Sequence, residues 1–409
     1  MNLLTLSLAH IRTQPLTTLL TLLLLTLGVG TIVVLLLFST QLEERLTRDT
    51  QGIDLVVGAK GSPLQLILST VYQVDVPTGN IPMKQAEIVN RHPLVATTIP
   101  LALGDAVAGF RIVGTRHAYI AHYGAELASG RLWKGELEAV LGATVTSRTG
   151  LSVGDRFEGS HGISGEGHAH SHHPYRVVGI LKPTGTTLDR LVVTGVESVW
   201  KVHQPQSEMV DPSPRPTMMA QPTTPSEEIT ALLVKYRSPV AAVSLPQFVN
   251  TQSALQAASP AFEITRLLSL IGVGLDVLRA FAWLLIATAT LSIFIALYSA
   301  LKRRQFDLAI MRTLGASRLH VLWFIILEGL LLSVGGTISG LFFGHLAAEG
   351  VAIWLRSTQQ LFFTGTAWVP EEFLLLLVAV VIGMVTALLP AVRAYRLDIA
   401  AVLAERQSA

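Results

Sequence analysis

The chain contains no cysteine and few charged residues. Because none of its 409 residues is Cys, disulfides, thiol catalysis and cysteine metal ligands are excluded. Asp, Glu, Lys and Arg make up 14% of the chain, whereas about 25% is usual in soluble globular proteins. Together with a mean hydropathy of +0.51, this composition indicates a membrane protein with a substantial polar part. The formal net charge of +2 gives no electrostatic basis for binding nucleic acid.

Two sequence patterns of catalysis are also missing. The sequence has no G-x-x-x-x-G-K-[ST] run, so it lacks a phosphate-binding loop, and ATP-driven work would require a partner. Gly162-Ile-Ser-Gly165 is followed by Glu166 rather than glycine, so a nucleophile elbow is absent as well. We therefore predict that the protein is not an enzyme and has no catalytic residues.

Four apolar runs are long enough to cross a bilayer, whose hydrocarbon core is about 30 Å thick. The first run could alternatively be a cleaved signal peptide, but it is too long for one and no small-x-small cleavage site follows it. Residues 263–279 show an apolar pattern that predicts a helix continuing into the second span. The predicted segments are a cytoplasmic N-terminus (1–15), span one (16–38), an extracytoplasmic domain (39–265), a stalk with span two (266–301), a cytoplasmic coupling helix (302–320), span three (321–348), an outer loop (349–372), span four (373–389) and a cytoplasmic tail (390–409).

The distribution of basic residues predicts the orientation in the membrane. Loops that carry Lys and Arg close to the spans stay in the cytoplasm. Arg356 is the only base between 349 and 372, whereas the N-terminal piece carries Arg12 and the tail carries several arginines. We therefore expect a multi-pass protein of the bacterial inner membrane, with both termini in the cytoplasm. The connector after span two is the richest in bases, with Lys302, Arg303, Arg304, Arg312 and Arg318.

Short β-rich pieces separated by Gly and Pro dominate residues 39–265. Residues 136–155 predict a strand, a helix and a Gly-Asp turn into another strand. The expected fold is thus an α-helical membrane protein with four transmembrane helices and a large α+β extracytoplasmic domain between spans one and two. The β-rich pieces are 53–57, 94–99, 106–113, 175–181, 191–196 and 241–245.

The connector between spans two and three predicts a short amphipathic helix. Phe306, Ile310 and Leu314 recur at every fourth residue and share one face, with Met311 beside them. Gly315 suits the C-terminal stop of such a helix. Two interpretations fit this pattern: the helix docks into a groove of a partner protein, or it lies against anionic lipid at the membrane surface.

Three stretches resemble a known family. Arg304-Gln-Phe-Asp-Leu-Ala-Ile-Met-Arg-Thr-Leu-Gly-Ala-Ser317 is similar to its R-x-x-[ED]-[IL]-[GA]-[IL]-x-[RK]-[AT]-[LIV]-G-A-[ST] segment. Ile326-Leu-Glu-Gly-Leu-Leu-Leu-Ser333 follows as its glutamate-bearing third span does, and Leu389-Pro-Ala-Val-Arg-Ala-Tyr-Arg-Leu-Asp398 is similar to its closing stretch. A looser match comes from Gly130-Arg131 and from Val140-Leu-Gly142 followed by Gly150-Leu-Ser-Val-Gly-Asp155. In these features the chain resembles the FtsX-like permeases of ABC systems, which include macrolide-export and lipoprotein-release permeases.

The resemblance implies partners and a mode of action. It implies a homodimer or heterodimer of permease subunits together with cytoplasmic ABC ATPase subunits, which carry the ATP and Mg²⁺. It also implies that the connector docks into the ATPase and that ATP-driven motion is passed to the extracytoplasmic domain. The predicted coupling residues are Arg303, Arg304, Phe306, Asp307, Ile310, Met311, Arg312, Leu314 and Gly315.

Two features of span three invite alternative interpretations. Glu328 lies about two turns into the span, where an ionisable group is costly. It is either part of the coupling or a local hydrogen bond or salt bridge near the cytoplasmic interface. Gly336, Gly340 and Gly344 repeat every four residues and form a face that allows close helix approach. That face either packs within the subunit or forms a dimer seam.

A histidine-rich stretch suggests a metal. Five of the 12 histidines lie between residues 161 and 173, and imidazoles suit Zn²⁺, Cu²⁺ or Ni²⁺. Glu166 or Asp155 could add an oxygen ligand. The spacing has no fixed-geometry signature, so a flexible zinc-collecting loop and a solvated hairpin tip are the two interpretations. The candidate ligands are His161, His168, His170, His172 and His173.

These observations predict a permease subunit of an ABC transporter. It would transmit ATP-driven motion to its extracytoplasmic domain for export, extraction or lipoprotein-type handling of a substrate, with a possible link to zinc. A periplasmic or lipoprotein partner and membrane lipid are expected besides the ATPase. The alternative is a non-transporting signal transmitter that controls a periplasmic enzyme or binding protein. A secondary transporter is disfavoured, because none of the four spans is broken near its middle.

Overall fold

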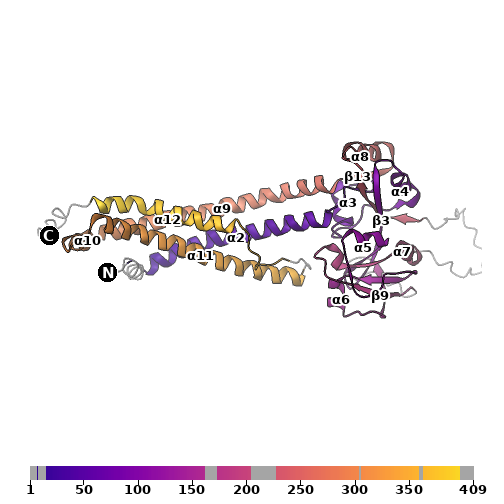
Figure 1. The fold of residues 1–409 in the computed structure, drawn as a ribbon, viewed down its shortest axis with the longest axis horizontal. Helices are drawn as coiled ribbons and strands as arrows, with labels where there is room; N and C mark the ends of the chain where they lie inside the picture. The colour runs from indigo at the N-terminus through magenta and orange to yellow at the C-terminus, as the bar shows by residue number, and fades with distance from the viewer. Residues whose placement is uncertain are drawn as a thin grey trace, which may run out of the picture. The chain divides into compact units, whose positions relative to one another are not determined.

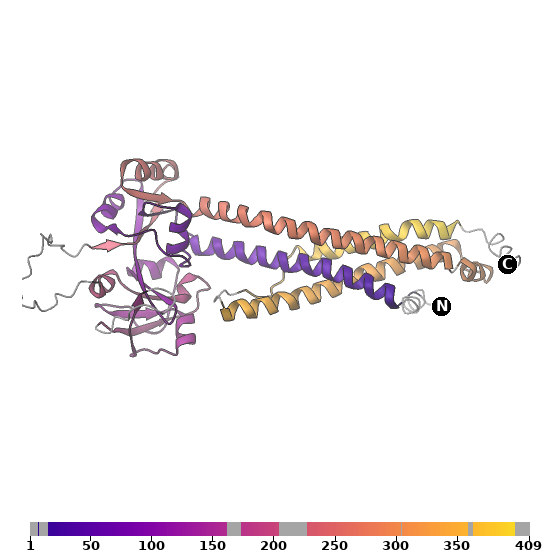
Figure 2. The ribbon, with the colours of Figure 1, turned by 180° about the vertical axis from the view of Figure 1, so that it is seen from behind.

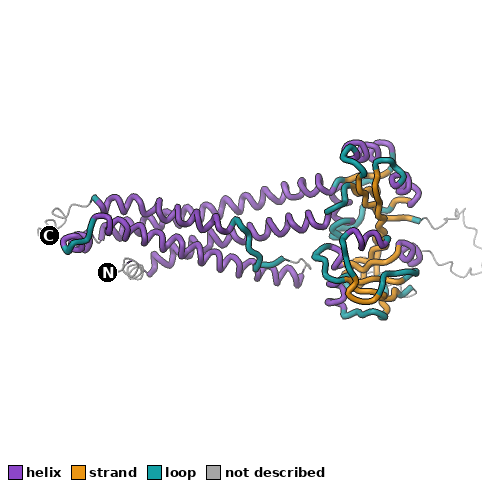
Figure 3. The backbone as a smooth tube through the Cα atoms, in the orientation of Figure 1, coloured by secondary structure: helices purple, strands orange, loops and turns teal. Residues whose placement is uncertain are grey.

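The computed structural model describes residues 7, 15–161, 173–203, 227–303, 305–358 and 363–396. They belong to two compact units. We call residues 1–43 and 269–409 the membrane unit and residues 44–268 the outer unit. Helices dominate the first and strands gather in the second, as Figure 3 shows by colour. The predicted ligands His168, His170 and His172, the side chain of His161 and the tail from residue 397 onward lie outside the described residues.

Four helices in the described part of the chain are long and apolar enough to cross a membrane, as predicted. They are α2 (Pro15–Thr50), α9 (Pro260–Arg303), α11 (Arg318–Thr358) and α12 (Glu372–Tyr395). Figures 1 and 2 show their membrane-unit parts side by side. With 36 and 44 residues, α2 and α9 are about 54 Å and about 66 Å long, beyond the bilayer core of about 30 Å. The helix predicted over 263–279 is therefore continuous with the second span.

Glycines let α11 pack closely against α2. A Cβ atom on Gly336 would lie 2.6 Å from Leu25 Cδ2, and one on Gly340 would lie 2.6 Å from Val29 Cβ. Gly344 makes the same kind of contact one turn further on. Close approach of this kind favours helix association in lipid, where apolar surface alone gives little driving force. These three glycines therefore pack within the subunit, which was one of their two interpretations.

The outer unit is built on a mixed sheet. Among the described residues, an 11-stranded sheet runs in the order β13-β1-β12-β3-β4-β10-β6-β9-β5, with β7 paired to β9 and β8 paired to β3, and a two-stranded sheet joins β11 and β2. The strands are β1 (Leu55–Ala59), β2 (Ile81–Pro82), β3 (Val95–Val107), β4 (Phe110–Thr115), β5 (Leu127–Gly130), β6 (Glu138–Leu141), β7 (Arg156–Phe157), β8 (Ser160–His161), β9 (Tyr175–Leu181), β10 (Leu191–Gly195), β11 (Glu228–Ile229), β12 (Ala231–Tyr236) and β13 (Leu255–Ala258).

Short helices connect these strands and cover two hydrophobic cores. One core includes Leu55, Leu232 and Leu245, and the other includes Phe110, Leu141 and further buried residues of β9 and β10. The α+β architecture expected for this part of the chain is confirmed. The short helices are α3 (Pro63–Thr70), α4 (Met83–Asn90), α5 (His117–His122), α6 (Ala143–Thr149), η1 (Thr187–Arg190), α7 (Val196–Val202) and α8 (Ala241–Gln252).

One of the predicted β-rich pieces, 241–245, is wrong, and another, 106–113, is interrupted by a turn. The piece over 106–113 contains a hairpin turn, because Ala108 and Gly109 adopt φ angles of 47° and 80° between β3 and β4. Two consecutive positive φ values are typical of tight two-residue hairpin loops. The piece over 241–245 begins helix α8, whose buried residues Ala241, Leu245 and Val249 are spaced by four, which is a helical repeat.

The glycine contact between α11 and α2 leads to a stability prediction. Gly340→Leu should lower the thermal stability of the full chain in lipid nanodiscs, at a cost of about 1–3 kcal/mol, because the new side chain overlaps Val29. Gly350→Leu is the matched control on the same helix, since a Cβ there meets no atom within 4 Å. Equal melting temperatures for the two variants would contradict a close α2–α11 contact.

Candidate coupling site

The predicted connector helix is present as α10 (Gln305–Thr313), and its end is capped. Gly315 adopts a left-handed φ of +103°. The Gly315 amide donates to Arg312 O at 3.2 Å, and the Ala316 amide donates to Met311 O at 3.0 Å. These two bonds are the Schellman pattern, which ends helices at glycine. The predicted stop at Gly315 is thus confirmed, and the turn of the chain into α11 is well defined.

The next residues explain the rest of the Gly-Ala-Ser stretch. Ser317 precedes α11, and its side-chain oxygen accepts from the His320 amide at 3.3 Å. The Ser317 hydroxyl also lies 2.7 Å from His320 Nδ1. Serine favours this position because its side chain satisfies a free amide at the helix start. Gly315 and Ser317 therefore end one helix and begin the next within three residues.

One face of α10 is anchored to the membrane unit. Leu308 is buried in a cluster with Leu301 at the end of α9 and with Val321 near the start of α11. Ala391 and Ala394 of α12 belong to the same cluster, and Met311 packs against it. Figure 1 shows α10 at this end of the helices, beside the end of α12. A push on α10 would therefore act on three spans at once.

The opposite face of α10 is exposed. Ile310 is 38% exposed and Leu314 is 82% exposed, as their common spacing predicted. Met311 differs from the prediction, since it is partly buried against the cluster rather than presented beside them. Its i, i+3 relation to Leu308 puts it on the anchored face. The side chains of Arg303, Arg304, Phe306 and Asp307 lie outside the described residues.

The closing stretch of the chain holds the same end of the unit together. The Arg393 guanidinium lies 5.0 Å from the centre of the Tyr298 ring on α9. Arg318 lies 6.0 Å from the centre of the Tyr395 ring. Such cation–π contacts contribute about 0.5–1 kcal/mol at exposed sites. The Pro-Ala-x-Arg-Ala-Tyr pattern therefore joins α12 to α9 and α11 at the end of the unit where α10 packs.

Glu328 is nearly buried on α11, and it is not without an interaction partner. Its neighbour Gly329 lies against α12, since a Cβ there would sit 2.9 Å from Ala387 Cβ and 3.0 Å from Gly383 O. Both interpretations of Glu328, a part in coupling and a local hydrogen bond or salt bridge, stay predictions.

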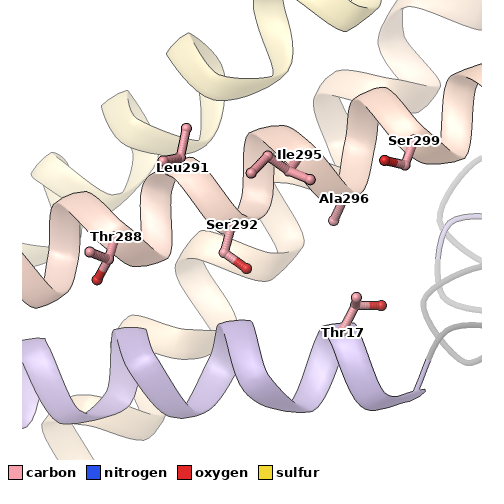
Figure 4. Close-up of a pocket in the computed structure, with 7 residues that line it drawn as sticks. All are labelled: Thr17, Thr288, Leu291, Ser292, Ile295, Ala296 and Ser299. Atoms are coloured by element: carbon pink, nitrogen blue, oxygen red, sulfur yellow. The ribbon is translucent and has the colours of Figure 1, made fainter.

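A small recess lined by hydroxyl groups lies between α2 and α9. Its volume is about 350 Å³, and Figure 4 shows Thr17 of α2 facing Ala296 and Ser299 of α9 across it. Beside it, the Thr21 and Ser292 hydroxyls form a hydrogen bond of 2.8 Å between the two helices. None of the described residues that line the recess is charged. The lining residues are Thr17, Thr288, Leu291, Ser292, Ile295, Ala296 and Ser299.

A larger groove lies between α2 and α11 and is almost wholly apolar. Its volume is about 830 Å³, and Leu19, Leu23, Phe343 and Leu346 line it together with the Gly30–Gly344 contact at its floor. Sequence reasoning did not identify this groove or the recess, because both depend on which faces of distant helices meet.

In the outer unit, tyrosines hold the end of α2. Tyr72 OH donates to Leu46 O at 2.9 Å, and Tyr123 OH donates to Asp49 O at 3.1 Å. The Asp49 carboxylate accepts from the Thr187 amide at 2.8 Å. Burial raises the pKa of Tyr72 well above its usual value, so its hydroxyl remains a donor at any physiological pH. The last turns of α2 are therefore fixed to the outer unit by three separate elements.

The weaker sequence matches in the outer unit are structural. A Cβ on Gly130 would lie 2.2 Å from Val178 O, so only glycine fits there. Arg131 binds the Glu138 carboxylate at 2.7 Å, and this pairing with nearby amides lowers the pKa of Glu138 to about 2. Gly142 is equally confined, because a Cβ would lie 2.4 Å from Asp189 O. These residues therefore stabilise loops of the fold.

The proposed metal site stays a prediction. His173 is the only one of the five candidate histidines whose side chain is described. Within the described ranges no group of three or more metal-binding side chains is close enough to hold an ion. The Asp155 carboxylate, a possible extra ligand, accepts from the Ser152 amide at 2.8 Å and so stabilises the turn before β7.

Comparison with known proteins identifies the two parts of the chain. A family model described as FtsX-like permease C-terminal matches residues 279–399. Another, described as MacB-like periplasmic core domain, matches residues 18–245. No curated protein matches the chain.

Similar solved structures include the periplasmic region of MacB from Actinobacillus actinomycetemcomitans, which is 12% identical, covers 53% of this chain and 95% of that one, and has a TM-score of 0.34. The extracellular domain of the noncanonic ABC-type transporter YknZ from Gram-positive bacteria is 10% identical, covers 50% of this chain and 99% of that one, and has a TM-score of 0.30. Because one family model spans more than half of the 409 residues and the other covers most of the remainder, the chain belongs to the FtsX-like permeases of ABC transporters with a MacB-like periplasmic core domain.

Proposed function

We propose that this permease passes the ATP-driven motion of a separate cytoplasmic ATPase from α10 to the outer unit. The motion would serve export, extraction or lipoprotein-type handling of a substrate. The observation that carries the proposal is α10 itself, a capped helix that is anchored on one face and exposes Ile310 and Leu314 on the other. Since the sequence has no phosphate-binding loop, the energy must come from a partner subunit.

Docking of α10 into a groove of the ATPase fits its shape and chemistry. An apolar helix face with basic residues around it is a common way for a helix to bind a groove. Leu314 is 82% exposed, far more than its apolar side chain favours in water. Burial of Leu314 and Ile310 in the partner would contribute about 1.5–3 kcal/mol each. The last turn of α10 also carries the positive charge of Arg312.

Transmission then follows the continuous helices. The α10 cluster includes Leu301 of α9, and α9 runs without a break from Pro260 to Arg303. The other route is α2, whose end is held in the outer unit by Tyr72 and Tyr123. A helix of this length resists compression because each turn is hydrogen-bonded, so displacement at one end is carried to the other. Both termini are proposed to lie in the cytoplasm, and the outer unit in the periplasm.

We also propose that the working complex contains two permease subunits, either identical or different, with two ATPase subunits that bind ATP and Mg²⁺. A periplasmic or lipoprotein partner would meet the outer unit. The family membership and the absence of an ATP site in the sequence support this composition.

The docking proposal predicts the effect of charge on the exposed face. Replacement of Ile310 and Leu314 by Asp should weaken co-purification of the ATPase from native membranes by about tenfold or more, because two buried apolar contacts are lost. Met311 is left unchanged, since it supports the fold of the helix. Val243→Asp is the matched control, because Val243 is an exposed apolar side chain of the outer unit, at 77%. Undiminished ATPase binding by the Asp variant would rule out docking through this face.

The tyrosine contacts predict a separate effect on transmission. The double change Tyr72→Phe and Tyr123→Phe removes two hydroxyl donors to the α2 backbone, at a cost of about 1 kcal/mol each. ATPase binding should be normal, whereas the ATP-dependent change in hydrogen exchange of the outer unit should diminish. Tyr175→Phe is the control, because the Tyr175 hydroxyl has no hydrogen-bond partner among the described residues. An unchanged exchange response in the double variant would contradict transmission through this contact.

We propose, finally, that the histidine-rich stretch between residues 161 and 173 collects zinc. Imidazole nitrogen is a preferred ligand of Zn²⁺, and the sequence places five histidines there. Calorimetric titration of the full chain at neutral pH should show Zn²⁺ binding that disappears when His168, His170, His172 and His173 are changed to Asn. Equivalent changes at His92 and His117 should leave it intact. Absence of any binding heat in the unchanged protein would exclude the zinc proposal.

A further inference from the structure

A buried histidine–glutamate pair joins α11 to α12 away from the coupling site. His345 Nε2 lies 3.0 Å from Glu372 Oε2, and the two side chains are only 17% and 1% exposed. The other ring nitrogen, His345 Nδ1, lies 2.6 Å from Gly365 O. Gly365 belongs to the loop between the two helices. Both nitrogens of one imidazole thus face oxygen atoms at hydrogen-bond distance.

The chemistry of these oxygens sets the number of protons. The Gly365 carbonyl can only accept, so His345 Nδ1 must donate to it. A neutral imidazole then has a lone pair on Nε2, which would face the carboxylate of Glu372. Two acceptors 3.0 Å apart repel each other unless a proton lies between them. The pair therefore needs one proton more than a neutral histidine and an ionised glutamate together contain.

The surrounding groups are arranged to hold the loop rather than to supply this proton. Glu349 on α11 accepts from the Gly365 amide at 2.7 Å, so its carboxylate is engaged on the other side of the glycine. Gln41 on α2 binds the Thr364 backbone twice, with Gln41 Nε2 2.7 Å from the carbonyl and Gln41 Oε1 3.1 Å from the amide. Gln41 carries no charge. The remaining nearby acid, Glu371, is exposed at the start of α12.

The contacts of the loop depend on close approach. A Cβ on Gly365 would lie 2.3 Å from the Glu349 amide nitrogen, so only glycine lets the loop reach α11. The Trp368 ring covers His345, with the ring centres 5.0 Å apart. The second oxygen of Glu372 accepts from the Val369 amide at 3.3 Å. His345 and Glu372 thus each bind the backbone of this loop as well as each other.

We propose that His345 and Glu372 form a proton-binding site that fastens the loop 363–371 across α2, α11 and α12. The ligand is a single proton, shared between the imidazole and the carboxylate. A released histidine keeps this proton only below about pH 6.5, so above that pH fastening requires uptake of a proton and is weakened as the pH rises. With the orientation proposed above, this proton would exchange with the periplasm. The site does not depend on the coupling of α10 to an ATPase, so either proposal can fail without the other.

The test uses the full chain in lipid nanodiscs between about pH 5 and pH 8, the range in which histidine changes charge. Nitrogen-15 NMR of labelled histidine, with the His345 signal assigned by its loss in His345→Gln, reports the protons on the ring. Hydrogen exchange of the Gly365 and Val369 amides, corrected for the intrinsic pH dependence of exchange, reports release of the loop.

We expect a doubly protonated His345 ring at the low end of this range. Loop exchange should increase by about tenfold or more at the high end, as expected when a hydrogen bond to a charged group is lost. Glu372→Gln should abolish this pH dependence while preserving the loop, because a glutamine amide can donate to neutral Nε2. Glu371→Gln is the matched control and should behave as the unchanged protein. Loop exchange that does not change with pH in the unchanged protein, or an undiminished pH dependence in Glu372→Gln, would overturn the proposal.

Discussion

The contact between α11 and α2 is the constraint on which the membrane unit depends. In lipid, apolar side chains gain little from leaving one apolar environment for another, so helices associate where their backbones can approach. Gly336, Gly340 and Gly344 provide that approach against Leu25, Val29 and Val33. A second close contact, through Gly329 and Gly383, joins α11 to α12. Helix α11 is therefore the common partner that positions both its neighbours.

Much of this organisation could be predicted from the sequence, because it rests on strong local signals. The length of each apolar run predicted the four spans, and the pattern over 263–279 predicted a continuous α9. Gly315 predicted the end of α10, since a left-handed residue there favours glycine. The predictions that failed concern short segments whose residues suit either a strand or a helix. Residues 241–245 contain β-branched and apolar residues that suit a strand, and only their contacts in the outer unit select a helix.

The site shows the same division between local pattern and tertiary contact. The spacing of Ile310 and Leu314 correctly predicted a shared exposed face, but Met311 lies on the other face because the cluster around Leu308 extends to it. The tyrosines at the end of α2 had no signal in the sequence, since Tyr72 and Tyr123 are far from Leu46 and Asp49 along the chain. The conspicuous motifs Gly130-Arg131 and Val140-Leu-Gly142 proved to stabilise loops. A motif can thus mark the fold of a permease while contacts such as those of Tyr72 and Tyr123 have no signal in the sequence.

Several polar groups of the membrane unit lie where helices end or turn, and this agrees with the cost of burying polar groups in lipid. Near α10, Ser317 accepts a hydrogen bond from an amide at the start of α11, and Arg393 and Arg318 lie over the rings of Tyr298 and Tyr395. At the loop 363–371, four side chains form hydrogen bonds with the loop backbone: Gln41, Glu349, His345 and Glu372. Gln41 lies on α2, five residues before Leu46, whose carbonyl accepts the hydrogen bond from Tyr72 of the outer unit. A change in the loop 363–371 would therefore reach α2 close to the residues that the tyrosines of the outer unit contact.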